Sequence, residues 1–274
     1  MPDMKTKVGE ENNSVGGRYI GNKGMLARFL LKFSRMHFFW YMAKYLNKGA
    51  SVLEFGPAGG NLWIAQYFKV TGIELSPRSA EACRQVYPEV QVGNICDVGT
   101  LGRTFDGVAS SFVLEHMAEE EAAAALRGCW AVLKPGGVLI CLCDLDCDHP
   151  ILARVRKHYP DAWREAFINI VGHIGLRRED DWKKLISSSG YNIVEWVVQS
   201  RFPVLDSCPM IQLSISPANG RVLRLVGTVF DRLNQVPYVM TIWNFAFSFL
   251  DWMTRPFLPR QWGYRLLFVA KKPE

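Results

Sequence analysis

Two carboxylates, each at the end of an apolar run, are the residues of this chain best placed to bind a ligand. Glu54 closes the run that begins at Val52, and a turn of small residues from Gly56 to Gly60 follows it. Glu74 closes the next apolar run, twenty residues further along. A strand that turns into a helix over glycines lets a ligand reach the backbone amides. A carboxylate at the end of the second strand of a doubly wound sheet is where a ribose diol binds. The pattern therefore predicts a nucleoside-cofactor site.

The glycine spacing distinguishes between two kinds of nucleoside cofactor. The dinucleotide pattern G-x-G-x-x-G, started at Gly56, would need glycines where Ala58 and Asn61 stand. The pattern acidic-x-G-x-G-x-G fits better, with Glu54, Gly56 and Gly60 in place and Ala58 in the middle slot. We expect alanine to cost little there, because it is the next smallest side chain. The spacing therefore disfavours a nicotinamide oxidoreductase, which shares the sheet and the ribose carboxylate.

Four further segments match in order, and with the turn they resemble the class I S-adenosylmethionine-dependent methyltransferases. Residues 72–77 resemble the second-strand motif of that family, and residues 92–97 resemble its adenine-binding loop. Residues 105–116 resemble its fourth strand with the loop that faces the methyl group, and residues 126–140 its next helix, turn and fifth strand. The resemblance covers residues 50–197 and the last strand. Residues 173–191 are similar to a segment common in bacterial methyltransferases of small molecules and glycans, so we expect that type.

The resemblance implies S-adenosyl-L-methionine as the cofactor and S-adenosyl-L-homocysteine as the product. It implies that Glu74 accepts hydrogen bonds from both ribose hydroxyls, and that backbone amides near Gly56 and Gly60 hold the methionine carboxylate. It also implies that Ile95 packs on the adenine while Asn94, where many relatives carry aspartate, meets the exocyclic amine. The full predicted cofactor-binding set is Glu54, Gly56, Ala58, Gly60, Glu74, Leu75, Asn94, Ile95, Ser111 and Phe112. The alternatives are a tight turn with strand-end charges, or a protein that binds the cofactor without turnover.

His116 and His173 are the candidate general bases of the predicted site. His116 follows the fourth strand, where the donor methyl group should point, and an ordinary histidine pKa of about 6.5 suits proton transfer near neutrality. The alternative is that both imidazoles pack structurally. Methyl transfer from a sulfonium needs in-line placement and partial exclusion of water rather than a metal. The acceptor we expect is a small molecule, a glycan or a lipid-linked molecule, methylated at oxygen.

The run from Cys141 to His149 holds thiols, carboxylates and an imidazole, all of which can bind zinc. The spacing argues against zinc, since Cys141 and Cys143 alternate along an apolar strand, whereas structural zinc sites favour C-x-x-C pairs. We therefore predict buried thiols and no metal site. Asp144, Asp146 and His149 are expected to border the substrate, because ligands in open α/β sheets bind beyond the carboxyl ends of the strands.

Alternating strands and helices predict an α/β fold with a doubly wound, mostly parallel sheet, and the resemblance implies seven strands with the last one antiparallel. The expected strands are 51–55, 70–74, 90–93, 107–111, 138–143, 191–198 and 264–270, and the expected helices are 25–46, 60–68, 77–86, 119–133 and 178–189. We expect a flexible N-terminus at 1–17, a helical cap at 18–49, a cofactor-binding core at 50–199 and 264–274, and an apolar helical insertion at 200–263.

The insertion has three interpretations. It could be a lid over the substrate, an interface of a homodimer, or a surface that meets lipid through residues 221–258, helped by Arg221, Arg224 and Arg232. The stretch from Val236 to Met253 approaches spanning length, but its polar residues and its proline argue against a transmembrane helix.

The composition fits an enzyme with an ordinary hydrophobic core. The 274 residues are 49% hydrophobic and 21% charged, enough to bury a large core. The net charge of +6 is too small for a nucleic-acid footprint, although it permits an anionic substrate or membrane surface. The first twenty residues contain no apolar stretch of a secretory signal, so we interpret the seven cysteines as reduced thiols. We therefore expect a cytoplasmic protein, with membrane association through the insertion as an option.

Overall fold

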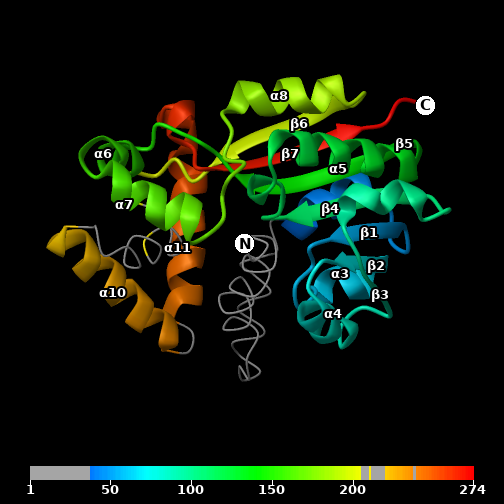
Figure 1. Ribbon diagram of the computed structural model, residues 1–274, viewed down its shortest axis with the longest axis horizontal. Helices are drawn as coiled ribbons and strands as arrows, with labels where there is room; N and C mark the ends of the chain where they lie inside the picture. The colour runs from blue at the N-terminus through cyan, green and yellow to red at the C-terminus, as the bar shows by residue number, and fades with distance from the viewer. Residues whose placement is uncertain (1–37, 205–209, 211–219, 237–238) are drawn as a thin grey trace, which may run out of the picture.

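The central sheet has seven strands in the order β3-β2-β1-β4-β5-β7-β6 (Figure 1). The computed structural model describes residues 38–204, 210, 220–236 and 239–274. β7 runs antiparallel to both of its neighbours, and the other pairings are parallel. The strands are β1 Ser51–Phe55, β2 Lys69–Glu74, β3 Glu89–Val92, β4 Phe105–Ser111, β5 Leu133–Asp144, β6 Asn192–Gln199 and β7 Arg265–Lys271. The predicted fold, with its antiparallel last strand, is therefore confirmed.

Helices cover both faces of the sheet, because side chains alternate across each strand. Val52 of β1 belongs to one hydrophobic cluster, with residues 38–46 and the helices α3 and α4. Leu53 and Phe55 belong to the other, with α5 and α8. The helices of the core are α3 Leu62–Tyr67, α4 Pro77–Arg84, η1 Ile95–Thr100, η2 Leu114–His116, α5 Glu119–Val132 and α8 Glu179–Ser188.

The sequence of α5 shows why this segment is a helix. Three glutamates occupy its first turn, where negative charge is favourable next to the exposed backbone amides. Apolar residues recur at helical spacing after them and are buried against the sheet: Ala122, Ala125, Leu126, Cys129 and Val132. α8 has the same pattern, with acidic residues in its first turn and Trp182, Leu185 and Ile186 on its buried face.

The described part of the predicted N-terminal helix lies on the sheet. Residues 38–45 are helical, and Met42 and Leu46 are buried against the strands. Gly107 of β4 makes this contact possible, because a side chain there would begin 2.6 Å from the Leu46 methyl group. The predicted flexible segment 1–17 and most of the predicted cap at 18–49 lie outside the described residues.

The segment after β5 forms short helices that the sequence analysis did not predict. They are α6 Pro150–His158, α7 Pro160–Arg164 and the π-helix η3 Glu165–Asn169. The predicted buried thiols are confirmed for Cys141 and Cys143, which lie on β5 inside the sheet. β5 ends at Asp144, so the rest of the run, up to His149, lies in the loop before α6.

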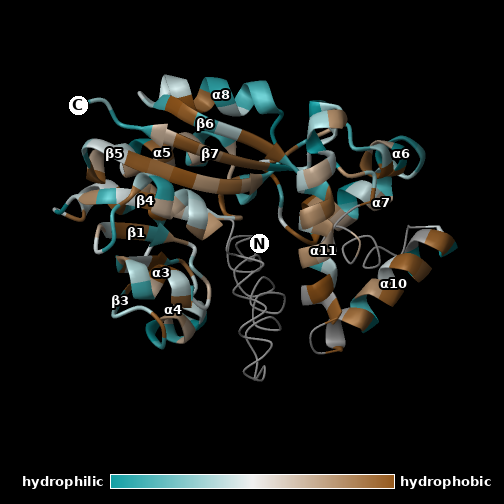
Figure 2. Cartoon of the chain, turned by 180° about the vertical axis from the view of Figure 1, so that it is seen from behind, coloured by the Kyte–Doolittle hydropathy of each residue, from teal (hydrophilic) through white to brown (hydrophobic). Residues whose placement is uncertain are grey.

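The insertion before β7 is helical, as predicted. It contains α10 Arg221–Gln235, α11 Val239–Thr254, η4 Arg255–Phe257 and η5 Arg260–Trp262. α10 and α11 project beside the sheet edge and carry many apolar side chains (Figures 1 and 2). Asp251 of α11 anchors them, because its buried carboxylate accepts hydrogen bonds from the backbone amides of Ser200, Arg201 and Phe202. Within the described ranges, no helix has both the length and the apolar character to cross a membrane.

Candidate functional site

The turn after β1 is built from residues with left-handed backbone angles. Gly56, Ala58 and Gly60 have φ values of +63°, +50° and +73°. Gly56 must be glycine, because a side chain there would begin 2.3 Å from a methyl carbon of Val113. We expected alanine at position 58 to be tolerated because its side chain is small, but side-chain size does not set its conformational energy here. The cost of a side chain here comes from the backbone angle, and left-handed geometry costs an L-residue roughly 1–2 kcal/mol.

Glu74 lies beside this turn, at the carboxyl end of β2. One of its oxygens accepts a hydrogen bond from the Ala58 amide at 3.0 Å, and the other accepts one from the Ser76 amide at 3.2 Å. Burial raises the pKa of Glu74, while these amide contacts act in the opposite direction. A carboxylate has about four lone-pair sites, so the fixed side chain still has acceptor capacity for a ligand diol.

Glu54 lies beneath the turn rather than on its surface. Its carboxylate is buried and accepts a hydrogen bond from the Tyr87 hydroxyl. The same hydroxyl accepts a hydrogen bond from the Asn61 amide at 3.0 Å, and the Asn61 side chain caps α3 by accepting from Trp63. Glu54 therefore supports the turn through Tyr87, a residue that the sequence analysis missed because no local pattern marks it.

In the predicted adenine-binding loop, Asn94 and Ile95 have structural partners within the protein. The Asn94 side-chain oxygen accepts a hydrogen bond from the Cys96 amide at 3.0 Å and caps η1. Ile95 is buried in the core, so it offers little surface to a ring. The exposed apolar surface at this edge belongs to Leu75, 59% exposed, and Val92, 49% exposed.

The loop after β4 begins with a strained residue. Phe112 has a φ of +58° and follows Ser111, the last residue of β4. The Arg265 guanidinium of β7 lies 4.9 Å from the centre of the Phe112 ring. The Phe112 amide donates to the Leu142 carbonyl of β5 at 2.7 Å, which holds the strained residue in place. Such angles outside glycine concentrate at functional sites.

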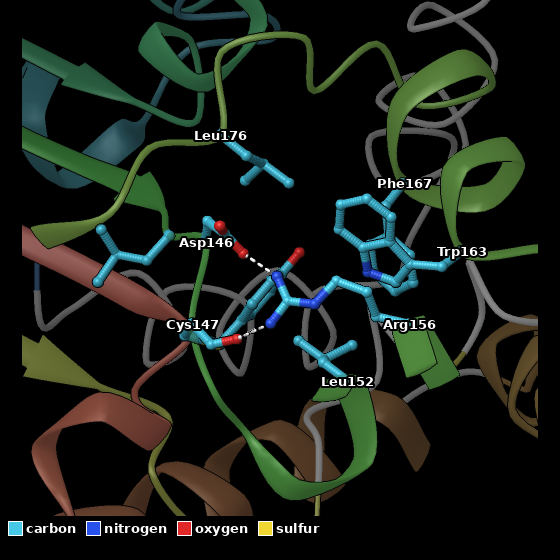
Figure 3. Close-up of a pocket in the computed structure, with 9 residues that line it drawn as sticks. Asp146, Cys147, Leu152, Arg156, Trp163, Phe167 and Leu176 are labelled. Atoms are coloured by element: carbon cyan, nitrogen blue, oxygen red, sulfur yellow. Dashed lines mark hydrogen bonds and ion pairs between the residues drawn. The ribbon is translucent and has the colours of Figure 1, made fainter. Parts of the chain in front are cut away.

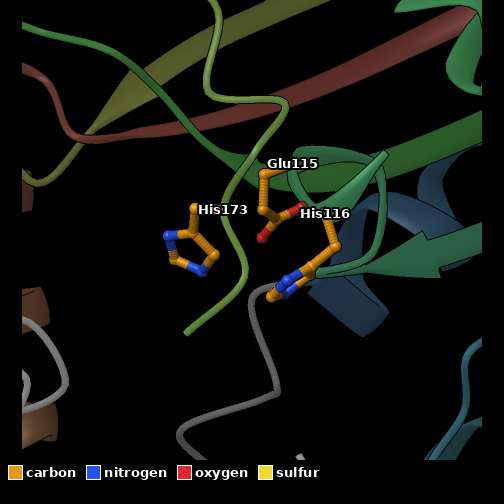
Figure 4. Close-up of side chains that lie close together, drawn as sticks. All are labelled: Glu115, His116 and His173. Atoms are coloured by element: carbon orange, nitrogen blue, oxygen red, sulfur yellow. The ribbon is translucent and has the colours of Figure 1, made fainter. Parts of the chain in front are cut away.

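The structure brings the two predicted bases together. The imidazoles of His116 and His173 lie with ring centres 4.7 Å apart, next to the Glu115 carboxylate (Figure 4). His116 Nδ1 lies 3.1 Å from the Gly172 carbonyl oxygen. Because a carbonyl only accepts, Nδ1 carries the proton and Nε2 is left with its lone pair. The predicted site residues did not include Glu115, although it directly precedes His116 in the sequence.

Burial controls the protonation of this cluster. It lowers the pKa of His116 to about 3, with His173 adding to the effect, and it lowers the pKa of His173 to about 4. The expected ordinary histidine pKa is therefore wrong for both rings, which are neutral near pH 7. Burial raises the pKa of Glu115 well above its usual range, and the neighbouring Asp144 raises it further. Burial also raises the pKa of Asp144, to about 6.

The other polar residues after β5 have structural partners. Buried His149 caps α6 by accepting from the Ile151 amide, and its other ring nitrogen lies 2.8 Å from the Phe202 carbonyl. Asp146 forms an ion pair with Arg156, whose guanidinium also donates to the Cys147 carbonyl at 3.0 Å (Figure 3). Asp146, Cys147 and Arg156 line a cavity of about 10 Å³, room for one water at most. A larger hollow of about 390 Å³ lies at the opposite edge of the sheet, around residues 45–50 and 134–137.

Comparison with known proteins identifies the domain that carries this site. Residues 53–141 match the model of the family described as "Methyltransferase domain". The chain is 29% identical over 99 residues to an uncharacterized methyltransferase of Oceanobacillus iheyensis. The match covers 34% of this chain and 46% of that protein, so it spans just under half of the curated relative.

Solved structures show the same fold at low sequence identity. A putative methyltransferase from Bacillus halodurans has a TM-score of 0.54 and 16% identity, over 87% of this chain and 100% of that one. A phosphoethanolamine N-methyltransferase from Haemonchus contortus, in complex with S-adenosylhomocysteine, has a TM-score of 0.54 and 13% identity, over 90% of this chain and 57% of that one. The [4+2]-cyclase SpnF has a TM-score of 0.51 and 18% identity, over 88% of this chain and 80% of that one.

The residues that match the methyltransferase domain form the part of the sheet that carries the glycine turn and Glu74. The matched residues begin in β1, contain the glycine turn and Glu74, and end in β5. The strand order and the antiparallel β7 complete a methyltransferase fold around them. Residues 53–141 therefore match a methyltransferase domain, and the sheet that contains them has the fold of solved methyltransferase structures.

Proposed function

We propose that this protein transfers a methyl group to an oxygen of a small-molecule, glycan or lipid-linked acceptor. One observation supports the proposal most: the glycine turn with Glu74 and the pair His116–His173 lie at the same edge of the sheet, after β1, β2 and β4. S-adenosylmethionine supplies a methyl group already activated by the positive charge on sulfur. The protein then has to place the acceptor in line with that group and exclude water, which can contribute roughly 7–11 kcal/mol.

The residues at this edge fit the cofactor. Left-handed angles at Gly56 and Gly60 open the backbone of the turn to a ligand. Hydrogen bonds from Ala58 and Ser76 hold the Glu74 carboxylate in one orientation beside it. Leu75 and Val92 provide exposed apolar surface next to Glu74. A diol, a carboxylate and a flat ring would each meet a suitable partner among these residues.

The paired histidines fit a role in holding the acceptor. Neutral His116, with Nδ1–H donated to Gly172, leaves Nε2 to accept a hydrogen bond from an acceptor hydroxyl. A depressed pKa makes the ring a weak base, so it would orient a hydroxyl better than it would deprotonate an aliphatic alcohol. The proposal therefore favours an acceptor whose hydroxyl is acidic or is activated by another group.

We further propose that the acceptor is reached from a membrane surface through residues 221–258. α10 exposes Val222, Leu225 and Val229 on one face, and exposed Arg221, Arg224 and Arg232 lie on the same helix. α11 exposes the aromatic side chains of Phe245, Phe249 and Trp252. Apolar side chains flanked by arginines complement an anionic lipid surface better than a second copy of the same basic helix, because like charges would face each other.

Calorimetric titration with S-adenosylhomocysteine tests the cofactor assignment. We expect micromolar binding by the wild type and no binding of NAD. Glu74→Ala should weaken S-adenosylhomocysteine binding by about 10- to 100-fold, since hydrogen bonds to a charged group are worth roughly 1.5–3 kcal/mol. Glu81→Ala is the matched control, because Glu81 is an exposed glutamate of α4 paired with Arg84. Equal affinities for all three proteins would contradict the ribose contact.

Methylation assays then separate an enzyme from a binding protein. One similar structure is a [4+2]-cyclase, so the fold alone does not establish methyl transfer. Transfer of a labelled methyl group to a phenol, sugar or lipid would support the proposal. Tight S-adenosylhomocysteine binding with no transfer to any of these classes would favour the non-catalytic alternative.

A further inference from the structure

We propose that Glu115, His116 and His173 form a binding site for a divalent transition-metal ion of the zinc class, open on one side to the oxygen of the acceptor. The three residues come from two segments, the loop after β4 and the segment before α8, and their side chains converge (Figure 4). One ligand atom from each residue lies within 4.8 Å of the others. Nitrogen and oxygen ligands bind zinc at about 2.0–2.2 Å, so small side-chain rotations would close the site around one ion.

The buried Glu115 carboxylate points into this cluster without a hydrogen-bond partner among the described residues, whereas His173 Nδ1 lies on the side of its ring away from the other two residues (Figure 4). Glu115 is 0% exposed and His173 is 3% exposed. Among the described residues, neither Glu115 carboxylate oxygen has a hydrogen-bond partner, and neither does His173 Nδ1. A buried carboxylate without a partner is costly, and a bound cation is one of the few ways to satisfy it. Polar atoms in a packed core are normally hydrogen-bonded, so these unpartnered oxygens are more typical of metal ligands.

Neighbouring backbone groups hold the ligands in position. The Gly172 carbonyl accepts the His116 Nδ1 proton at 3.1 Å, which orients the ring and leaves Nε2 for an ion. The Gly175 amide donates to the Glu115 carbonyl at 2.8 Å, so the segment carrying His173 is fixed to the one carrying Glu115. Gly175 leaves no room for a side chain, which would begin 2.1 Å from the Met117 carbonyl oxygen. The three ligands are thus supported by a close contact between two segments.

Two imidazoles and one carboxylate form a donor set with open coordination positions. Catalytic zinc uses such a set with a water or substrate as the remaining ligand. No thiolate belongs to the cluster, although Cys141, Cys143 and Cys147 lie elsewhere on β5 and after it. His116 is the partly exposed member of the cluster, so we expect the open position to lie on its side.

The ion would activate the acceptor hydroxyl, and this role rests on the proposed function. A hydroxyl bound to a divalent ion loses its proton near neutral pH, as metal-bound water does. The hydroxyl proton leaves to solvent, the oxygen forms its bond to the methyl carbon, and the carbon–sulfur bond of the donor breaks. The ion keeps its oxidation state throughout, and His116 Nε2 would then hold the acceptor oxygen through the ion rather than by a direct hydrogen bond.

The test is ion binding by the full chain after treatment with a chelator. Calorimetry with Zn²⁺ and the visible absorption of Co²⁺ should both report one ion per chain. Glu115→Gln and His173→Ala should each weaken binding at least tenfold. Glu115→Gln keeps the size of the side chain, so the ion-free variant should melt close to the wild type. An unchanged melting temperature shows that the variant is folded, so its loss of binding is informative.

Two control variants locate the ion. His158→Ala removes an exposed histidine of α6 and should leave binding unchanged. Cys147→Ser changes a buried thiol of the run after β5 and should also leave it unchanged. No Zn²⁺ binding by the wild type, or binding that survives Glu115→Gln and His173→Ala but is lost in Cys147→Ser, would overturn the proposal. Titrating the same proteins with S-adenosylhomocysteine keeps the two proposals separate, since either ligand can bind when the other does not.

Discussion

Ala58 carries a left-handed backbone angle that glycine adopts without steric cost. Ala58→Gly should therefore stabilise the protein by about 0.5–1 kcal/mol. The roughly 1–2 kcal/mol of relieved strain is partly offset by the greater freedom of glycine in the unfolded chain, about 0.4–1 kcal/mol. Chemical denaturation measures the difference. Ala65→Gly in α3 is the matched control and should destabilise, because glycine is unfavourable in a helix. A loss of stability in Ala58→Gly would show that the methyl group makes a contact worth more than the strain.

The Tyr87 hydroxyl connects Glu54 to the glycine turn, so Tyr87→Phe should affect both stability and cofactor binding. Loss of the hydroxyl leaves a buried carboxylate without this donor, which costs about 1–3 kcal/mol of unfolding free energy. We expect S-adenosylhomocysteine affinity to fall several-fold as the turn relaxes. Tyr191→Phe is the control, because its buried hydroxyl donates to the Leu126 carbonyl at 2.9 Å on the other face of the sheet. It should lose stability while keeping cofactor affinity, and equal effects of the two variants on affinity would contradict the role given to Tyr87.

Sequence reasoning predicted the turn after β1, whose backbone geometry is local. Gly56 and Gly60 follow a strand directly, and their left-handed angles are a property of that turn. Tyr87 was missed, because it contributes through a contact with Glu54, 33 positions away. His173 was predicted as a candidate base, but its contact with His116, 57 positions away, was not. No pattern within a segment encodes such contacts. The depressed histidine pKa values also follow from burial, which only the packed structure defines.

At the scale of the elements, Asp106 joins β1, β4 and the start of β5. Its carboxylate accepts hydrogen bonds from the Ser51 amide and hydroxyl at 2.7 Å and from Lys134 at 2.6 Å. The contact with Lys134, followed by those with Ser51, lowers the pKa of Asp106 to about 2. An unfolded aspartate has a pKa of about 3.9, so folding favours the ionised form. The stabilisation is therefore present above that value and is lost as the pH falls towards 2.

Asp106→Asn should accordingly lower the melting temperature near neutral pH and reduce its fall between about pH 4 and pH 2. Thermal melts across that range measure both effects. Asp180→Asn serves as the control, because Asp180 is almost fully exposed and its pair with Lys183 should contribute little. An unchanged acid profile in Asp106→Asn would mean that other carboxylates dominate acid unfolding.

Helices and strands were largely predictable where apolar residues recur at a regular spacing and residues typical of turns or helix ends flank them. α8 was expected at 178–189 and lies at Glu179–Ser188, with acidic residues at its start and a buried face at helical spacing. The segment from α6 to η3 was not predicted. Its three short helices begin at prolines or continue as a π-helix, so none is long enough to show a clear period. Their existence depends on packing against the edge of the sheet.

At the scale of the whole molecule, the unusual feature is the apolar surface of α10 and α11 beside the sheet edge that carries the site (Figure 2). Val222 is 74% exposed and Leu225 is 65% exposed, at positions one helical turn apart. Large exposed apolar surfaces mark contacts with a partner or a membrane. Insertion into a lipid surface would bring the edge with Glu74 and His116 towards acceptors held in that surface. The predicted cytoplasmic location remains a prediction and is compatible with such a contact.

Co-sedimentation with lipid vesicles tests the membrane proposal. Binding should be strong to vesicles containing anionic lipid, weak to neutral ones, and should decrease with salt, because each arginine near an anionic surface contributes about 1 kcal/mol. A double variant, Val222→Asp with Leu225→Asp, should reduce binding at least tenfold, since it places charge in the apolar face. Thr228→Asp adds one negative charge, against two in the double variant, on an exposed position nearer the arginines, and should reduce binding by much less than half as much in free energy. If the wild type is instead a dimer that the double variant dissociates, and neither binds vesicles, the surface is a subunit interface and the acceptor must reach the site from solution.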